Sequence, residues 1–221
     1  MKVIAVIPAY NEERTIREVI VMVKKNVDQV IVINDGSTDQ TAKLAQEAGA
    51  EVYSHFLNRG LGAALITGFE AALKQGADII ITFDADGQHR PEDISRLIEP
   101  ILKDEAEVVI GSRFLEKQPM PLSRRVYNLI ANFITHLLFG LWVSDSQSGL
   151  RVFKRQALKK IKIQSDRMEV SSEIIREIKR NKLKLKEIPI KPIYTDYSMS
   201  KGQNFRVGLK TFFRLILEKI L

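Results

Sequence analysis

Two aspartates, Asp84 and Asp86, stand shortly after the apolar run 79–81. Such a run is typical of a buried parallel strand, and the Pro-Glu-Asp sequence at 91–93 suits the first turn of a helix. Residues two apart on an extended segment point to the same side, so both carboxylates could hold a hard divalent cation. A cation there would neutralise a diphosphate and make it a better leaving group. The alternative is a pair of exposed acids in a turn, where short acidic triplets are common.

Polar side chains also follow the other predicted strands. The first strand ends near Tyr10, the second runs into Asp35, and the fifth precedes Arg113. Ligands of open α/β sheets bind at the carboxyl ends of the strands, so we expect these side chains to meet the two aspartates at one edge. Asp35 is expected to be free to accept hydrogen bonds from a base or a ribose, with an ordinary turn aspartate as the alternative.

Strands and helices alternate along the first half of the chain. Strand-like runs at 30–33, 51–54 and 108–110 are separated by helical patterns, of which 13–25 is the first. This alternation predicts an α/β fold with a doubly wound, Rossmann-like sheet that is mostly parallel.

Two loops carry more detailed signals. Ser37 and Gln40 have the spacing of a capping box, which predicts a helix from Thr38. The segment around Gly60 and Gly62 looks like a phosphate-binding loop but lacks the Lys-Ser/Thr pair and the third glycine of the known fingerprints. It therefore predicts close packing at the start of a helix.

Composition limits the class of protein. A chain of 221 residues suffices for one domain with a full core, and the absence of cysteine excludes disulfides and thiolate metal sites and fits a cytoplasmic protein. Residues 1–110 carry 11 Lys and Arg against 18 Asp and Glu, whereas 111–221 carry 23 against 9. The basic half could face nucleic acid, a membrane surface or only solvent. The run 154–191 has almost no aromatic residues for base stacking, which argues against nucleic acid.

Two segments of the second half are amphipathic. The eighteen residues 126–143 are mostly apolar, with Asn128, Asn132 and Thr135 on one helical face. This pattern predicts a helix that lies in the membrane interface rather than crossing the bilayer, with an ordinary core helix as the alternative. Residues 205–221 predict a basic amphipathic C-terminal helix with a narrow polar stripe. We therefore expect a peripheral protein on the cytoplasmic face of a membrane.

Five ordered motifs carry a resemblance to a known family. They are Pro-Ala-Tyr-Asn-Glu at 8–12, Asn-Asp-Gly-Ser-Thr-Asp at 34–39, Asp-Ala-Asp-Gly-Gln-His at 84–89, Gly-Ser-Arg at 111–113 and Asp-Ser-Gln-Ser-Gly at 145–149. With these motifs, residues 2–155 resemble a family 2 glycosyltransferase of the GT-A fold, in particular the branch of dolichol-phosphate mannose synthase and polyprenyl-phosphate glycosyltransferases. Asn34 departs from the family, which often has an aspartate there, while Asp35 matches the second aspartate of the motif.

The resemblance implies a site for a nucleotide diphosphate sugar, with GDP-mannose or UDP-glucose as the donor. The donor-binding residues would be Pro8, Tyr10, Glu12, Ile33, Asp35, Asp84, Ala85, Asp86 and Gln88. The cofactor would be Mg²⁺ or Mn²⁺, held by Asp84, Asp86 and Gln88. His89 could join the metal, and a hydrogen-bonded loop histidine is the alternative.

The resemblance also implies a polyprenyl or dolichyl phosphate acceptor. Its binding residues would be Arg113, Arg125, Ser200 and Lys201, the last two in a lid at 194–202. Asp86, Asp145 and Arg113 would be catalytic, with Asp145 as a base or as an acceptor-orienting group. A phosphate monoester with a second pKa of about 6 is largely dianionic at neutral pH, so Asp145 need not remove a proton.

We expect a nucleotide-sugar-binding core at 1–155, including the interfacial helix, and an acceptor and lid region at 156–221. In the latter, Glu169 is a lower-ranked site residue and Glu173 is interpreted as solvated surface. The predicted reaction transfers mannose or glucose to the lipid phosphate, inverting the anomeric carbon by direct displacement. The alternatives are a saccharide, protein or cell-wall acceptor, or a non-catalytic nucleotide-sugar-binding membrane scaffold.

Overall fold

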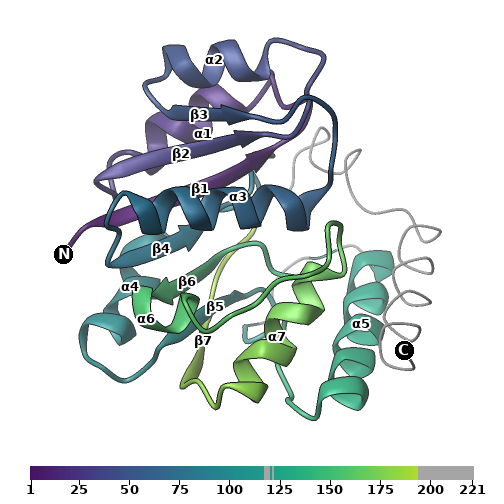
Figure 1. Ribbon diagram of the computed structural model, residues 1–221. Helices are drawn as coiled ribbons and strands as arrows, with labels where there is room; N and C mark the ends of the chain where they lie inside the picture. The colour runs from purple at the N-terminus through teal and green to yellow at the C-terminus, as the bar shows by residue number, and fades with distance from the viewer. Residues whose placement is uncertain (117–119, 121, 194–221) are drawn as a thin grey trace.

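The computed structural model describes residues 1–116, 120 and 122–193, which form a seven-stranded sheet with helices on both faces (Figure 1). The strands have the spatial order β3-β2-β1-β4-β6-β5-β7. Their bounds are β1 Val3–Ala9, β2 Gln29–Asn34, β3 Glu51–Ser54, β4 Ile79–Thr82, β5 Val108–Ser112, β6 Arg151–Lys154 and β7 Leu185–Pro189. The helices are α1 Ile16–Val23, α2 Thr41–Glu47, α3 Leu61–Lys74, α4 Asp93–Leu102, α5 Leu122–Phe139, α6 Arg155–Leu158 and α7 Val170–Arg180. The predicted α/β class with a mostly parallel sheet is confirmed.

One strand runs against the others. β6 lies between β4 and β5 and pairs antiparallel with both, so that Arg151 is opposite Thr82 on one side and Ile110 on the other. Because β6 is antiparallel, its first residue lies beside the carboxyl ends of β4 and β5. The loop that precedes β6 therefore lies at the carboxyl ends of β4 and β5, which is the edge where ligands of such sheets bind.

The alternation of side chains along the strands builds two cores, one on each face of the sheet. In β1, Ala5 and Ile7 join the core that α1 and α4 cover, while Ile4 and Val6 join the core that α3, α6 and α7 cover. All four side chains are fully buried. Burial on both faces explains why these strands are continuous apolar runs.

The predicted start of the second helix is wrong by three residues. α2 begins at Thr41, and the Asp39 carboxylate accepts hydrogen bonds from the backbone N–H and the hydroxyl of Thr41. Ser37 instead accepts a hydrogen bond from the backbone N–H of Asn11, at 3.0 Å. The capping-box spacing is thus present but serves to tie two loops together.

The glycines at the start of α3, Gly60 and Gly62, behave as predicted. A Cβ on Gly62 would lie 1.8 Å from the carbonyl oxygen of Ser165, and one on Gly60 would lie 2.5 Å from that of Asp166. Neither position leaves room for a side chain. The segment therefore allows the start of α3 to approach the 165–166 backbone closely.

The first amphipathic helix lies four residues earlier than predicted. α5 spans Leu122–Phe139 rather than 126–143 and stops where Gly140 adopts a φ of +69°. The backbone N–H of Gly140 donates to the carbonyl oxygen of His136, a typical helix ending. Among the described residues, no helix combines the length and the hydrophobicity needed to cross a bilayer.

Candidate active site

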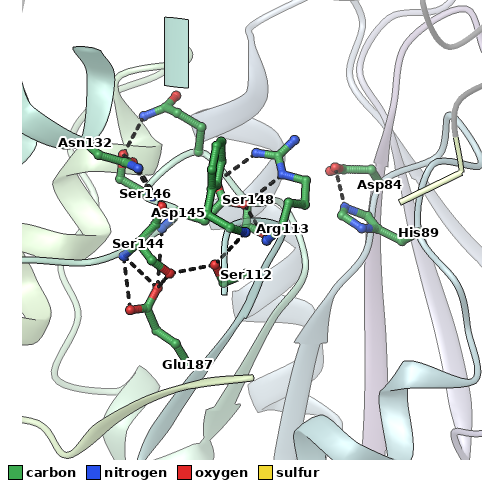
Figure 2. A network of polar contacts seen from close by, with 12 residues as sticks. Asp84, His89, Ser112, Arg113, Asn132, Ser144, Asp145, Ser146, Ser148 and Glu187 are labelled. Atoms are coloured by element: carbon green, nitrogen blue, oxygen red, sulfur yellow. Dashed lines mark hydrogen bonds and ion pairs between the residues drawn. The ribbon is translucent and has the colours of Figure 1, made fainter. Parts of the chain in front are cut away.

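Asp84 and Asp86 lie in the loop that follows β4. One oxygen of Asp84, Oδ2, is 2.9 Å from Nε2 of His89 (Figure 2). A Cβ on Gly149 would lie only 2.1 Å from the other oxygen, so a glycine is needed where the loop before β6 passes Asp84. His89 is a buried, hydrogen-bonded loop histidine, the second of its two predicted roles.

Asp86 is organised by its own loop. Its Oδ1 accepts the backbone N–H of Gln88 at 2.9 Å, and its Oδ2 accepts the side-chain amide of Gln88 at 2.6 Å. Gly87, at a φ of +74°, makes the tight turn that this arrangement needs.

The two aspartates have opposite electrostatic environments. Burial and the negative charge of Asp84 raise the pKa of Asp86 to about 6. Burial also opposes ionisation of Asp84, but the hydrogen bond and charge of His89, together with the charges of Arg113 and Arg151, lower the pKa of Asp84 below its ordinary value. The charge of Asp84 thus makes ionisation of Asp86 costly, and a bound cation would offset that cost.

The Asp84–Asp86 pair suits a divalent cation that takes some of its ligands from the protein and the others from a bound substrate. Within the described part of the chain, no three His, Asp or Glu side chains are grouped to hold a metal by themselves. Mg²⁺ is commonly held by one or two carboxylates together with substrate phosphates and water. Asp84 and Asp86, with Gln88 beside them, fit that pattern.

Four other predicted donor residues lie at the ends of β1 and β2. Pro8 and Ile33 are opposite each other in the parallel register. Tyr10 is about half exposed at 45%. Glu12 is buried, and its negative charge contributes to the raised pKa of Asp86, which indicates that the ends of β1 and β4 are close.

Asp35 is not free, contrary to the expectation from the sequence. Its Oδ1 accepts the backbone N–H of Arg59 at 2.9 Å and pairs with Nδ1 of His55 at 2.7 Å. Its Oδ2 accepts the backbone N–H of Gly60 at 2.8 Å. The carboxylate therefore fixes the loop between β3 and α3, because a buried acid takes the backbone donors nearest to it. A contact with the base or ribose would use the acceptor capacity that these bonds leave.

Arg113 and Asp145 form a bidentate ion pair in the site. Nε of Arg113 lies 2.7 Å from Oδ2 of Asp145, and Nη2 lies 2.8 Å from Oδ1. The backbone N–H of Arg113 also donates to Oδ2, at 3.0 Å, and the Asp145 carboxylate is fully buried. A bidentate guanidinium occupying both oxygens suits a group that orients Arg113 better than one that removes a proton.

Arg151 is a buried cation whose pKa is affected by the charges of this pair. Its guanidinium donates to the backbone carbonyls of Ser146, Ser148 and Ser171. Burial lowers its pKa to about 10, and the charges of Asp145 and Asp84 oppose that shift. Arg151 therefore anchors the loop before β6 and supplies positive charge to both acids.

Residues 4–162 match the family model described as Glycosyl transferase family 2. The chain belongs to glycosyl transferase family 2. It is 43% identical over 238 residues to the UDP-N-acetylglucosamine–dolichyl-phosphate N-acetylglucosaminyltransferase of Methanococcus voltae, covering 97% of this chain and 95% of the relative. It is 33% identical over 171 residues to the polyprenol monophosphomannose synthase of Mycolicibacterium smegmatis, covering 72% of this chain and 64% of the relative.

A solved structure shares the fold of this family 2 glycosyltransferase. The glucosyl-3-phosphoglycerate synthase of Mycobacterium tuberculosis, in complex with Mn²⁺, UDP and glucosyl-3-phosphoglycerate, superposes with a TM-score of 0.76 over 99% of this chain and 79% of that one. The two sequences are 21% identical, so this likeness supports the GT-A architecture alone.

The remaining predicted residues divide into three groups. Arg125 is exposed on the first turn of α5. Ser200 and Lys201, with the predicted lid at 194–202 and helix at 205–221, lie outside the described residues. Glu169 is buried just before α7.

The interpretation of Glu173 as solvated surface is wrong. Its carboxylate is 1% exposed, and it accepts the backbone N–H groups of Gln164 and Ser165 at 3.0 and 2.9 Å. Arg176 donates to it at 2.7 Å. Glu173 therefore holds the 164–165 segment onto α7, because a loop with buried N–H groups needs an acceptor.

Sequence reasoning missed three residues of this glycosyltransferase. They are His55, which pairs with Asp35, Arg151, and Glu187 of β7, which accepts hydrogen bonds from Ser144 and Asp145. Only Arg151 carried a signal, as a charged residue between the apolar residues Leu150 and Val152. The partners of the other two are distant in the sequence.

Proposed function

We propose that the protein transfers a sugar from a nucleotide diphosphate sugar to a polyprenyl or dolichyl phosphate. The observation that carries the proposal is the meeting of two unequal acids, Asp84 and Asp86, with the Arg113–Asp145 pair at one sheet edge. The first pair suits a cation and a diphosphate, and the second presents a guanidinium for an anion. The dolichyl-phosphate and polyprenol relatives support a lipid acceptor.

In this proposal the acceptor phosphate oxygen attacks the anomeric carbon opposite the leaving diphosphate, inverting its configuration. The acceptor needs no strong base, because a phosphate monoester is mostly dianionic at neutral pH. Asp145 holds the guanidinium of Arg113 in place, and Arg113 stabilises negative charge at the reacting centre. Mg²⁺ or Mn²⁺ held by Asp84, Asp86 and Gln88 would neutralise charge on the departing diphosphate.

For the sugar, the Methanococcus voltae relative adds N-acetylglucosamine to the mannose and glucose expected from the sequence. That relative is covered almost completely and is 43% identical, which favours UDP-N-acetylglucosamine as the first donor to test. Mannose and glucose stay as predictions.

The outer face of α5 supports a membrane surface as the site of action. Its polar residues face inward, since Asn128, Asn132 and Thr135 are buried. Its apolar residues face outward, and Phe133 and Leu137 are 58% and 69% exposed. The exposed apolar side chains of this face are Leu122, Val126, Leu129, Ile130, Phe133 and Leu137. A helix that presents such a stripe, with Arg125 near its start, fits the boundary between headgroups and acyl chains.

A donor and acceptor panel tests the proposal. Purified protein with Mg²⁺ or Mn²⁺ is given UDP-N-acetylglucosamine, GDP-mannose or UDP-glucose together with a short polyprenyl phosphate. We expect one donor to yield a glycosyl phospholipid by mass spectrometry, with release of the nucleoside diphosphate. Transfer only to a saccharide or protein acceptor would replace the lipid assignment. Donor binding without release in any mixture would instead favour the non-catalytic scaffold.

A further inference from the structure

The turn that carries Asp145 is held from two sides (Figure 2). On one side, Asn132 of α5 donates from Nδ2 to the carbonyl oxygen of Ser144 at 2.5 Å. Its Oδ1 accepts the backbone N–H and the hydroxyl of Ser146, both at 2.8 Å. On the other side lies Glu187 of β7. Residues on both sides of Asp145 are therefore fixed by elements outside the turn.

Glu187 makes a concentrated set of contacts to this turn. Its Oε1 accepts the backbone N–H of Ser144 at 2.9 Å, the Ser144 hydroxyl at 2.7 Å and the backbone N–H of Asp145 at 3.3 Å. Its Oε2 lies 3.0 Å from the same Ser144 N–H. Two successive N–H groups that converge on one carboxylate fix the orientation of the peptide between them.

The orientation of that peptide decides where the Asp145 side chain points. The Asp145 carboxylate binds Nε and Nη2 of Arg113, and the charge of Arg113 reaches Asp84 across the site. Glu187 therefore binds the backbone N–H of Asp145, and the side chain of the same Asp145 binds the guanidinium of Arg113. A single residue connects Glu187 to Arg113.

We propose that Glu187 is a positioning residue for the transferase reaction, acting through the 144–145 backbone on the Asp145–Arg113 pair. The inference rests on the proposed function, because it concerns the rate of the same transfer. A small displacement of a charged group at a reacting centre lowers the rate strongly, so a remote clamp can matter to turnover.

The first test compares three variants in the transfer assay. Glu187→Gln keeps the volume but replaces one acceptor oxygen with an amide, and Glu187→Asp keeps the charge with a shorter reach. Glu105→Gln is the matched control, because Glu105 forms an exposed ion pair with Lys186, the neighbour of Glu187 on β7. We expect Glu187→Gln to lower kcat about 10- to 100-fold with the donor KM nearly unchanged. Glu187→Asp should recover part of the loss, and the control should match the wild type.

A double-variant cycle separates positioning from a purely structural role. If Glu187 acts through Asp145, adding Glu187→Gln to Asp145→Asn should lower kcat less than about threefold further. Independent losses that multiply would overturn the proposal. So would a Glu187→Gln variant with wild-type kcat, or one whose lost rate follows only a fall in the folded fraction.

A measurement without substrate keeps this inference separate from the proposed function. Trp142 is the single tryptophan of the chain and lies two residues before Ser144, with its ring 5.3 Å from that of His136. We expect Glu187→Gln, but not Glu105→Gln, to change the acrylamide quenching of its fluorescence. If the wild type transferred no sugar to polyprenyl phosphate, the proposed function would fail while this measurement still decided whether Glu187 sets the turn. Unchanged quenching in Glu187→Gln would overturn the positioning role in either case.

Discussion

The two halves of the site are held in different ways. On the donor side, Asp86 is bound by a residue two positions away and Asp84 by a residue five positions away. On the acceptor side, Arg113 and Asp145 are 32 residues apart, and Ser144 and Glu187 are 43 apart. The hydrogen bonds that orient the acids suited to a cation therefore lie within one short loop, whereas the guanidinium that faces them depends on three separate segments.

This contrast suggests which half tolerates change. A loop whose hydrogen-bond partners are only a few residues apart in the sequence adopts its geometry whenever the chain folds. A centre assembled from β5, β6 and β7 requires the sheet to be complete before its charges meet. Substitutions on the donor side should thus affect chemistry more than stability, and substitutions on the acceptor side should affect both.

The largest expected effect is that of Asp86→Asn on turnover. Loss of the carboxylate removes a proposed cation ligand, and we expect kcat to fall at least about 1,000-fold. The melting temperature near pH 8 should be unchanged or higher, because the raised pKa shows that ionised Asp86 is unfavourable in the fold.

The measurements are nucleoside diphosphate release and thermal unfolding of the same samples. Asp28→Asn serves as the control, since Asp28 lies at the opposite end of the sheet, where it accepts the backbone N–H of Val3. An active Asp86→Asn enzyme would contradict the cation assignment.

On the acceptor side, Asp145→Ala should damage rate and fold together. It removes the carboxylate that pairs with the Arg113 guanidinium, which is only 13% exposed, and breaking such a buried pair costs about 3–5 kcal/mol of unfolding free energy. We expect kcat to fall about 100-fold in the fraction that stays folded. Urea unfolding and steady-state kinetics measure the two losses.

The control is Glu99→Gln, which breaks the exposed Lys103–Glu99 pair and should leave both quantities near the wild type. Equal stability of Asp145→Ala and the wild type would contradict the claim that the acceptor side contributes to stability as well as to turnover.

The pH dependence of cation binding sharpens the comparison further. Asp86 must lose its proton to bind a cation, and its pKa is raised to about 6, so Mn²⁺ affinity should fall about tenfold per pH unit below 6 and level off above it. In the cation-free protein, the same shift means that stability contributed by protonated Asp86 is present at low pH and is lost as the pH rises through 6. Calorimetric Mn²⁺ titrations at pH 5, 6, 7 and 8 test this, and a flat profile would argue against Asp86 as the ligand.

The smallest effect on chemistry is expected from the outer face of α5. Phe133→Asp places a charge among exposed apolar side chains, so binding to anionic liposomes should weaken at least about fivefold in a flotation assay. Activity on a short, water-soluble acceptor should stay within about twofold of the wild type, because the substitution lies outside the reacting centre. Leu102→Asp is the control, since Leu102 is 56% exposed on α4. Equal liposome binding by all three proteins would indicate that something other than a membrane covers this face.

Much of the donor side could be predicted from the sequence. The apolar runs that became β1, β2 and β4 are buried on both faces, and the aspartates follow β4 where the spacing places them. The predictions were wrong where a polar side chain could bind more than one partner in the folded chain. Ser37 has a capping residue's chemistry but ties two loops together, and Asp35 satisfies the 59–60 backbone instead of standing free.

The sequence by itself determined the α/β class, the family and the acidic loop, because periodicity and short motifs act over a few residues. Only the tertiary structure decided the partners of Arg113, the burial of Glu173 and the inward polar face of α5. For the partner of Arg113, the physical reason is the antiparallel β6, which brings the 145–149 loop beside the ends of β4 and β5. No short-range pattern encodes strand direction, since it depends on how distant segments share one sheet. A carboxylate that is solvated in one register can therefore be a fully buried ion-pair partner in another.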